Sequence, residues 1–193
     1  MTDGRRPAVF LDRDGTLIEE RGYLSRLEAL ALFPFAVDAV RLLNRAGFAV
    51  VVLTNQSGVA RGYFEEAFVQ ETHRVLAARI AEGGGRIDAF YYCPHYPDAK
   101  VERYRQTCEC RKPKPGMLLR AAADLSLDLS RSFSVGDRWS DVEAGLAAGA
   151  RGVLVRTGFG GIAADEPRPD LAAARVVANL MEATSWILRE HAR

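Results

Sequence analysis

The sequence lacks any apolar run close to the roughly 20 residues that a membrane-spanning helix needs. The apolar stretch after Arg5 and Arg6 is also far too short for a signal peptide. Neither sign of charge is in excess, because 26 lysines and arginines face 25 aspartates and glutamates, and such a balance does not favour binding to nucleic acid or membranes. We therefore expect a cytoplasmic protein that binds a small molecule rather than nucleic acid or a membrane, and we expect it to be a monomer.

Cysteine is scarce, and all three cysteines fall between residues 93 and 110. An odd number of clustered cysteines favours a metal site over a disulfide framework. Cys93 and His95 form one pair at one-residue spacing, and Cys108 and Cys110 form another. Three thiolates and one imidazole complete a closed tetrahedral Zn²⁺ site, which would order the loop rather than perform hydrolysis. The alternative is three small buried hydrophobic side chains and an unrelated histidine.

The 193 residues are 48% apolar and 26% charged, an ordinary globular composition with enough chain for one sizeable core. Strand-like and helix-like stretches alternate, and this order is typical of βαβ units and a parallel sheet. The expected strands are 8–11, 48–53, 87–92, 132–136, 152–155 and 175–178. The expected helices are 34–45, 65–82, 115–125, a segment ending near 148, and 180–191. We predict a single α/β domain over 1–193, a three-layer Rossmannoid sheet with helices on both faces.

Three irregular segments interrupt this alternation. Residues 18–33 are expected to form a loop over the carboxyl end of the first strand. Residues 93–114 are expected to form a long loop, and such a loop usually has a function or is held by a cross-link such as a bound metal. A glycine-rich loop is expected at Gly158–Gly161. His73, within a helix, and His191, in the tail, are expected at the surface.

Two carboxylates directly follow the first expected strand. Asp12 and Asp14 are two residues apart, and residues at this spacing in an extended chain point the same way. Gly15 then allows the backbone to turn away. Paired carboxylates at the carboxyl end of a buried strand suit a divalent cation and a phosphoryl group bridged by it. The alternative is an Asp-Gly turn with one spare acid.

The ends of two further strands add polar side chains to the same expected edge of the sheet. Thr54 and Asn55 offer a hydroxyl and an amide, although such residues also begin turns. Asp137 would complete the set of carboxylates around a metal. Asp141, one helical turn later, either orients its neighbours or complements the dipole of the following helix.

A cationic pair follows the last expected zinc ligand. Arg111 and Lys112 come directly after Cys110, so a metal on that thiolate would also fix their backbone. The planar fork of Arg111 and the point charge of Lys112 would both suit a phosphate. The alternative is a solvated basic loop.

Together these motifs resemble those of the haloacid-dehalogenase-like phosphohydrolases. The resemblance covers about residues 8–157 and rests on Asp-Arg-Asp-Gly-Thr at 12–16, Thr-Asn-Gln-Ser-Gly-Val-Ala-Arg-Gly at 54–62, Cys-x-Cys-Arg-Lys-Pro-x-Pro-Gly-Met at 108–117 and Gly-Asp-x-x-x-Asp at 136–141. It implies a Mg²⁺-dependent phosphoric monoester hydrolase with a zinc loop. The form of the motifs implies a heptose 1,7-bisphosphate of either anomer as substrate, dephosphorylated at C7. Histidinol phosphate, recognised through acids such as Glu19, Glu20 and Glu28, is the alternative.

The resemblance also implies roles for individual residues. Asp12 would be the nucleophile that forms an aspartyl-phosphate, and Asp14 would be the general acid and base. Thr54 and Lys112 would stabilise the oxygens of the transferring phosphoryl group. The Mg²⁺ ligands would be Asp12, Asp137 and the backbone carbonyl of Asp14. The substrate-binding residues would be Glu20, Arg21, Gly22, Tyr23, Asn55, Gln56, Ser57, Arg111 and Arg138.

The intervals between the motifs leave no room for a cap domain. About 40 residues separate Asp12 from Thr54 and about 57 separate Thr54 from Lys112, and the core elements and the zinc loop occupy both intervals. We therefore expect an open site. A non-catalytic, zinc-stapled binder of phosphorylated ligands is the remaining alternative, and the intact set of carboxylates argues against it.

Overall fold

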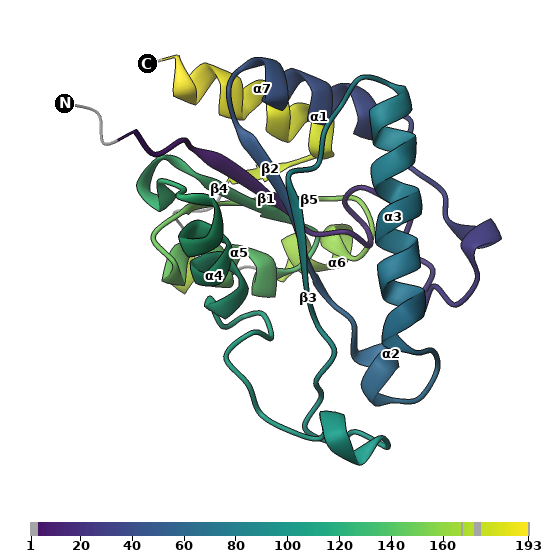
Figure 1. Ribbon diagram of the computed structural model, residues 1–193. Coiled ribbons are helices and arrows are strands. Elements are labelled where there is room, and N and C mark those ends of the chain that lie inside the picture. Colours follow the sequence, from purple (N-terminus) through teal and green to yellow (C-terminus); the bar gives the residue numbers. More distant parts are fainter. Residues whose placement is uncertain (1–3, 167, 172–174, 193) are drawn as a thin grey trace.

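The computed structural model describes residues 4–166, 168–171 and 175–192. Six parallel strands form one sheet in the order β3-β2-β1-β4-β5-β6 (Figure 1). The strands are β1 (Ala8–Leu11), β2 (Ala49–Asn55), β3 (Ala89–Cys93), β4 (Phe133–Gly136), β5 (Arg151–Val155) and β6 (Arg175–Val177). The predicted parallel α/β sheet is confirmed.

Helices cover both faces of the sheet (Figure 1). The α-helices are α1 (Ala36–Arg45), α2 (Ser57–Ala60), α3 (Glu66–Glu82), α4 (Gly116–Leu125), α5 (Trp139–Ala147), α6 (Gly160–Asp165) and α7 (Leu180–His191). One face packs against α1, α3 and α7, and the other packs against α4 and α5. None of the helices in the described part of the chain combines the length and apolar content needed to span a bilayer.

Strand β1 lies at the centre of the sheet, and its side chains enter the hydrophobic cores on both faces. Val9 and Leu11 point into the core under α1, α3 and α7, whereas Ala8 and Phe10 point into the core under α4 and α5. A strand buried on both faces needs a continuous apolar run, which is what this stretch provides. The strand order reverses between β1 and β4, and in such sheets ligands bind at the carboxyl ends of the strands beside this switch point.

The prediction of a glycine-rich loop at Gly158–Gly161 is only partly right. Gly158 lies in a turn, as expected, but helix α6 begins at Gly160, so Gly160 and Gly161 are helical. A Cβ atom at Gly160 would lie only 1.7 Å from the carbonyl oxygen of Val155, so glycine is needed for this close approach. Gly158 has a φ of +56°, which also favours glycine. The glycines therefore make a tight connection into a helix, which composition alone does not separate from a loop.

His73 is the second correction, because it is buried rather than at the surface. Only 6% of His73 is exposed, and its ring stacks on Phe90 of β3 with the ring centroids 4.6 Å apart. Burial and, to a lesser degree, the nearby Arg13 guanidinium lower the pKa of His73 to about 3. Its Nε2 atom has no hydrogen-bond partner. His191 is exposed, as expected.

We predict that His73→Phe reduces the loss of stability in acid. Below about pH 6.5 the unfolded chain binds a proton at His73, while the folded chain keeps the ring neutral down to about pH 3, so stability is lost as the pH falls through this range. The unfolding free energy of the variant minus that of the original protein should therefore be about 2 kcal/mol larger at pH 5 than at pH 7. Urea unfolding at both pH values measures this gain, and an unchanged difference would contradict a neutral buried ring.

Candidate active site

A cleft of about 630 Å³ lies at the carboxyl ends of the central strands. Twelve of the predicted site residues line it: Asp12, Asp14, Glu20, Gly22, Tyr23, Thr54, Asn55, Gln56, Ser57, Arg111, Lys112 and Arg138. Arg21 does not line the cleft and instead pairs with Glu19 at the surface. Asp137 is fully buried beside the cleft. The folded chain therefore brings together residues that five separate stretches of the sequence supply.

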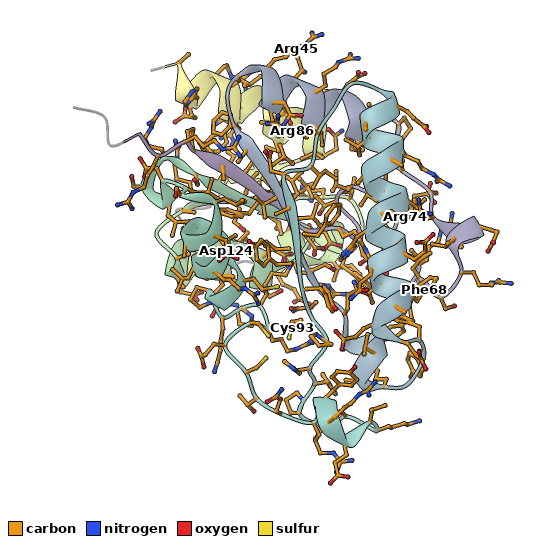
Figure 2. The ribbon with its side chains drawn as sticks, viewed as in Figure 1. Arg45, Phe68, Arg74, Arg86, Cys93 and Asp124 are labelled. Carbon is orange, nitrogen blue, oxygen red and sulfur yellow. The ribbon has the colours of Figure 1, made fainter. Side chains whose placement is uncertain are left out.

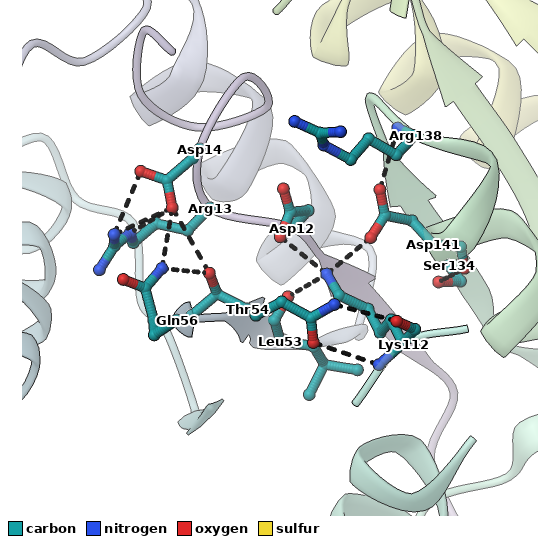
Figure 3. A network of polar contacts seen from close by, with 11 residues as sticks. Asp12, Arg13, Asp14, Leu53, Thr54, Gln56, Lys112, Ser134, Arg138 and Asp141 are labelled. Atoms are coloured by element: carbon teal, nitrogen blue, oxygen red, sulfur yellow. Dashed lines mark hydrogen bonds and ion pairs between the residues drawn. The ribbon is translucent and has the colours of Figure 1, made fainter. Parts of the chain in front are cut away.

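Lys112 is the central cation of the site (Figure 3). Its Nζ lies 2.7 Å from Asp12 Oδ1 and 2.6 Å from Asp141 Oδ1, and it donates to the carbonyl oxygen of Leu53 at 2.6 Å. Burial by itself would lower the pKa of Lys112, but the two carboxylates outweigh it and hold this pKa above its usual range. The site thus contains a permanent buried positive charge next to Asp12.

Asn55 explains how the loop carries Lys112 to this position. The Asn55 side chain donates to the Lys112 carbonyl oxygen at 3.0 Å and accepts from the Lys112 backbone N–H at 3.1 Å. This pair of hydrogen bonds fastens the loop to the end of β2. The amide of Asn55 therefore positions Lys112, while its contact with substrate stays a prediction.

A cluster of three carboxylates fits a divalent cation. Ligand oxygens of Asp12, Asp137 and Asp141 all lie within 4.8 Å of one another. Asp137 Oδ2 accepts a hydrogen bond from the Phe159 backbone N–H at 2.8 Å, whereas its Oδ1 is buried without a partner. Burial raises the pKa of Asp137 to about 7, although the Phe159 N–H opposes this shift. An unpartnered buried oxygen among clustered acids is a position that a hard cation such as Mg²⁺ would satisfy.

The side chain of Asp14 belongs to a different network from this cluster (Figure 3). Its carboxylate forms a two-point contact with Arg13, with Nε to Oδ2 at 3.0 Å and Nη2 to Oδ1 at 3.1 Å. Gln56 Nε2 donates to Asp14 Oδ2 at 3.0 Å and to Thr54 Oγ1 at 2.7 Å. The predicted Mg²⁺ role of Asp14 involves its backbone carbonyl, so this side-chain arrangement does not conflict with it.

The four predicted zinc ligands meet at the base of the long loop, which starts at Cys93 at the end of β3 (Figure 2). Cys108 Sγ lies 3.5 Å from Cys93 Sγ and 3.3 Å from Cys110 Sγ, and His95 Nδ1 lies 3.4 Å from Cys110 Sγ. A tetrahedral site with Zn–S bonds of about 2.3 Å places its sulfurs about 3.8 Å apart. Both the donor set and the spacing therefore fit Zn²⁺, and all three cysteines are free thiols.

One wall of the cleft is cationic and includes residues that sequence analysis did not select. The guanidinium carbon of Arg61 lies 4.2 Å from the centre of the Tyr96 ring, and that of Arg111 lies 5.2 Å from the same ring. Arg111 also donates to the carbonyl oxygen of His95 at 3.3 Å. Arg61 lies inside the quoted motif at 54–62, so its position in that motif was the available signal.

Phe159 is another residue of the cleft that sequence analysis did not select. The guanidinium carbon of Arg138 lies 3.9 Å from the centre of the Phe159 ring, and the Phe159 backbone N–H holds Asp137. This residue links one cationic side chain of the cleft to the buried carboxylate. Its place at the start of α6 is set by packing, and no local motif indicates it.

The sequence of this chain is similar to one family model and to phosphatases of known name. The HAD-hydrolase-like family model matches residues 109–183. The D-glycero-beta-D-manno-heptose-1,7-bisphosphate 7-phosphatase of Escherichia coli (strain K12) is 46% identical over 153 residues, covering 79% of this chain and 80% of that protein. The enzyme of the same name from Photorhabdus laumondii is 47% identical, covering 82% of this chain and 84% of that protein.

Comparison of structures agrees. The crystal structure of D,D-heptose 1,7-bisphosphate phosphatase from B. bronchiseptica, complexed with magnesium and phosphate, superposes with a TM-score of 0.85 at 33% identity, covering 95% of this chain and 99% of that one. The enzyme of that name from Burkholderia thailandensis gives a TM-score of 0.67 at 30% identity, covering 97% of this chain and all of that one. The predicted haloacid-dehalogenase-like resemblance is confirmed.

We predict that the Cys/His cluster holds one Zn²⁺ per chain and that its removal loosens the loop, because metal binding at such a site is coupled to local folding. Stripping the metal with a chelator should speed hydrogen–deuterium exchange across residues 93–111. Residues 8–11 in β1 are the internal control and should not change. Metal analysis before and after stripping, with Cys108→Ser as a second route to metal loss, completes the test. Unchanged exchange in a zinc-free protein would contradict the prediction.

Proposed function

Because this chain belongs to the family of D-glycero-beta-D-manno-heptose-1,7-bisphosphate 7-phosphatases, we propose that it hydrolyses the C7 phosphate of a heptose 1,7-bisphosphate, with Asp12 as the nucleophile. The observation that carries this assignment to residues is the position of the Asp12 carboxylate. It lies at the switch point of the sheet, 2.7 Å from the buried ammonium group of Lys112 and beside two further carboxylates. This arrangement supports phosphoryl transfer to a carboxylate that neighbouring charges hold in place.

The proposed reaction divides one slow displacement into two steps. In the first step a carboxylate oxygen of Asp12 forms a bond to phosphorus while the bond to the C7 oxygen breaks, and Asp14 gives its proton to that oxygen. In the second step water attacks phosphorus, the bond to Asp12 breaks, and Asp14 takes a proton from the water. The products are the heptose 1-phosphate and inorganic phosphate, and both aspartates return to their starting states.

The surrounding charges support this chemistry. Lys112 and Thr54 are placed to stabilise the oxygens of the transferring group. The residues that would hold Mg²⁺ are Asp12, Asp137 and the backbone carbonyl of Asp14, and the unpartnered Asp137 Oδ1 supports this assignment. When bound there, Mg²⁺ would offset the negative charge of Asp12 and of the incoming phosphate. Zn²⁺ in the four-ligand cluster would be structural, because no ligand position stays open for water.

The cationic wall supports a substrate with a second phosphate. Arg61 and Arg111 flank Tyr96 in the same cleft as Asp12, and no described carboxylate forms an ion pair with either guanidinium. Guanidinium forks suit phosphate oxygens, so we place the 1-phosphate against this wall. Contacts from Glu20, Gly22, Tyr23, Gln56, Ser57 and Arg138 to the sugar stay predictions, as does a contact from Arg21.

The same wall disfavours histidinol phosphate, whose amine is a cation. Of the acids suggested for binding an amine, only Glu20 lines the cleft, whereas Glu19 pairs with Arg21 and Glu28 is exposed elsewhere. The organisation as one domain over residues 1–193, an open site without a cap, a monomeric state and a cytoplasmic location remain predictions.

We predict that Asp12→Asn abolishes turnover, because an amide does not act as the nucleophile. Loss should exceed ~10³-fold in kcat. The measurement is release of inorganic phosphate from the heptose bisphosphate in the presence of Mg²⁺, with circular dichroism to confirm the fold. Normal turnover by a folded Asp12→Asn protein would contradict the covalent mechanism.

We also predict that Arg61→Met weakens the preference for a substrate with a second phosphate over one without it. Loss of one charged hydrogen-bonding partner should lower kcat/KM for the heptose bisphosphate by roughly 10- to 100-fold. The value for the heptose 7-phosphate, which lacks the second phosphate, should change little. Arg103→Met is a matched control, because Arg103 also lies over a tyrosine ring but outside the cleft. Equal losses on both substrates would place Arg61 outside the 1-phosphate site.

A further inference from the structure

We infer that Arg13, which lines the cleft but whose side chain is only 3% exposed, is a positioning residue for proton transfer that acts by fixing the carboxylate of Asp14. The inference rests on the proposed role of Asp14 as general acid and base. It concerns a residue to which none of the motif assignments above gives a role. Its basis is the contact between the two side chains and the burial of the arginine.

Two nitrogens of the Arg13 guanidinium contact the Asp14 carboxylate. Arg13 Nε donates to Asp14 Oδ2 at 3.0 Å, and Arg13 Nη2 lies 3.1 Å from Oδ1 and 2.9 Å from Oδ2. Two nitrogens of one rigid guanidinium, both close to Oδ2 and one also within reach of Oδ1, restrict the position and the plane of the carboxylate. An aspartate needs this support, because its terminal torsion is broad and does not select one plane by itself.

Arg13 is buried and has few other polar partners. Its side chain is 3% exposed, and among the described residues Asp14 is the only acid that pairs with it. A buried charge is costly unless a counter-charge and hydrogen bonds compensate it, so the guanidinium depends on Asp14 as much as Asp14 depends on the guanidinium. Nearby His73 stays neutral, with its pKa lowered to about 3, and therefore adds no competing charge.

Other donors complete the support from the cleft side. Gln56 Nε2 and Thr54 Oγ1 lie 3.0 Å and 3.4 Å from the same Oδ2 that Arg13 Nε contacts. Oδ2 is thus surrounded by donors, whereas among the described residues Oδ1 has only the contact with Arg13 Nη2. Side-chain exposure of Asp14 is 21%, so the carboxylate is also open to the cleft. The arrangement suits a carboxylate that is held in place on one side and remains accessible to the cleft for proton exchange.

This role has a chemical signature in the first step. As the bond from phosphorus to the leaving oxygen breaks, that oxygen needs the proton from Asp14 when it would otherwise become an alkoxide. A nitrophenolate leaves without a proton. A misplaced Asp14 therefore slows transfer from an alkyl phosphate such as the sugar phosphate, but not transfer from 4-nitrophenyl phosphate. A purely structural role for Arg13 would slow both.

The experiment compares kcat/KM for the heptose bisphosphate and for 4-nitrophenyl phosphate, since this ratio reports the steps up to formation of the aspartyl-phosphate. For Arg13→Met we expect a loss of ~10² on the sugar phosphate, the effect of a small misplacement of a reacting group. On 4-nitrophenyl phosphate the loss should stay within about threefold. Arg13→Lys, which keeps the charge without the fork, should fall between the original protein and Arg13→Met.

Two controls separate this role from instability and from failure of the proposed function. Leu76→Ala removes a buried core side chain of α3 away from the cleft, so it should lower thermal stability without changing the ratio of the two substrates. Asp14→Asn should show the same leaving-group pattern as Arg13→Met, and adding Arg13→Met to it should cost little more.

Each outcome decides the question. Equal losses of Arg13→Met on both substrates, or full additivity with Asp14→Asn, would overturn the positioning role. If Asp14→Asn itself shows no leaving-group dependence, then the assignment of Asp14 fails first and the role of Arg13 fails with it. A selective loss on the sugar phosphate that is absent in the Asp14→Asn background supports the inference.

Discussion

The buried ion pair between Lys112 and Asp12 is the contact on which the rest of the site depends. An ammonium group inside a protein is costly unless acids and hydrogen-bond acceptors surround it. Here two carboxylates and the carbonyl oxygen of Leu53 do so. Because Lys112 comes from a loop and Asp12 from the central strand, this pair also joins the loop to the sheet. The ion pair therefore has two roles: it places a positive charge beside Asp12, and it attaches the loop to the sheet.

The loop is held by more than the packing of Ala99 and Tyr104 against Val59. The Cys/His cluster closes it at Cys93 and Cys110, and the Asn55 side chain grips the backbone of Lys112 two residues later. The two attachments lie on opposite sides of Arg111, which leaves this side chain a limited range of positions over Tyr96. A long loop that is fastened on both sides of Arg111 can thus place two cations accurately in the cleft.

The sequence was most informative where structure is local. The apolar run at 8–11, the acids after it and the cysteine spacing each depend on a few adjacent residues, and the structure agrees with them. It was least informative where the outcome depends on distant packing. The burial of His73 requires knowing that α3 lies on Phe90, and the start of a helix at Gly160 requires the carbonyl oxygen of Val155. For the same reason motif spacing did not indicate Phe159 as part of the cleft.

The position of Phe159 has a thermodynamic consequence. Its backbone N–H holds one oxygen of Asp137, and its ring lies against the guanidinium of Arg138. An anion bound by Arg138 in the cleft therefore contacts a side chain that packs on the residue orienting the buried carboxylate. Linkage is reciprocal, so the factor by which a cation held by Asp137 changes the affinity for an anion at Arg138 equals the factor by which that anion changes the affinity for the cation. One aromatic residue thus joins the side chains that would hold the two opposite charges of a metal–phosphate complex.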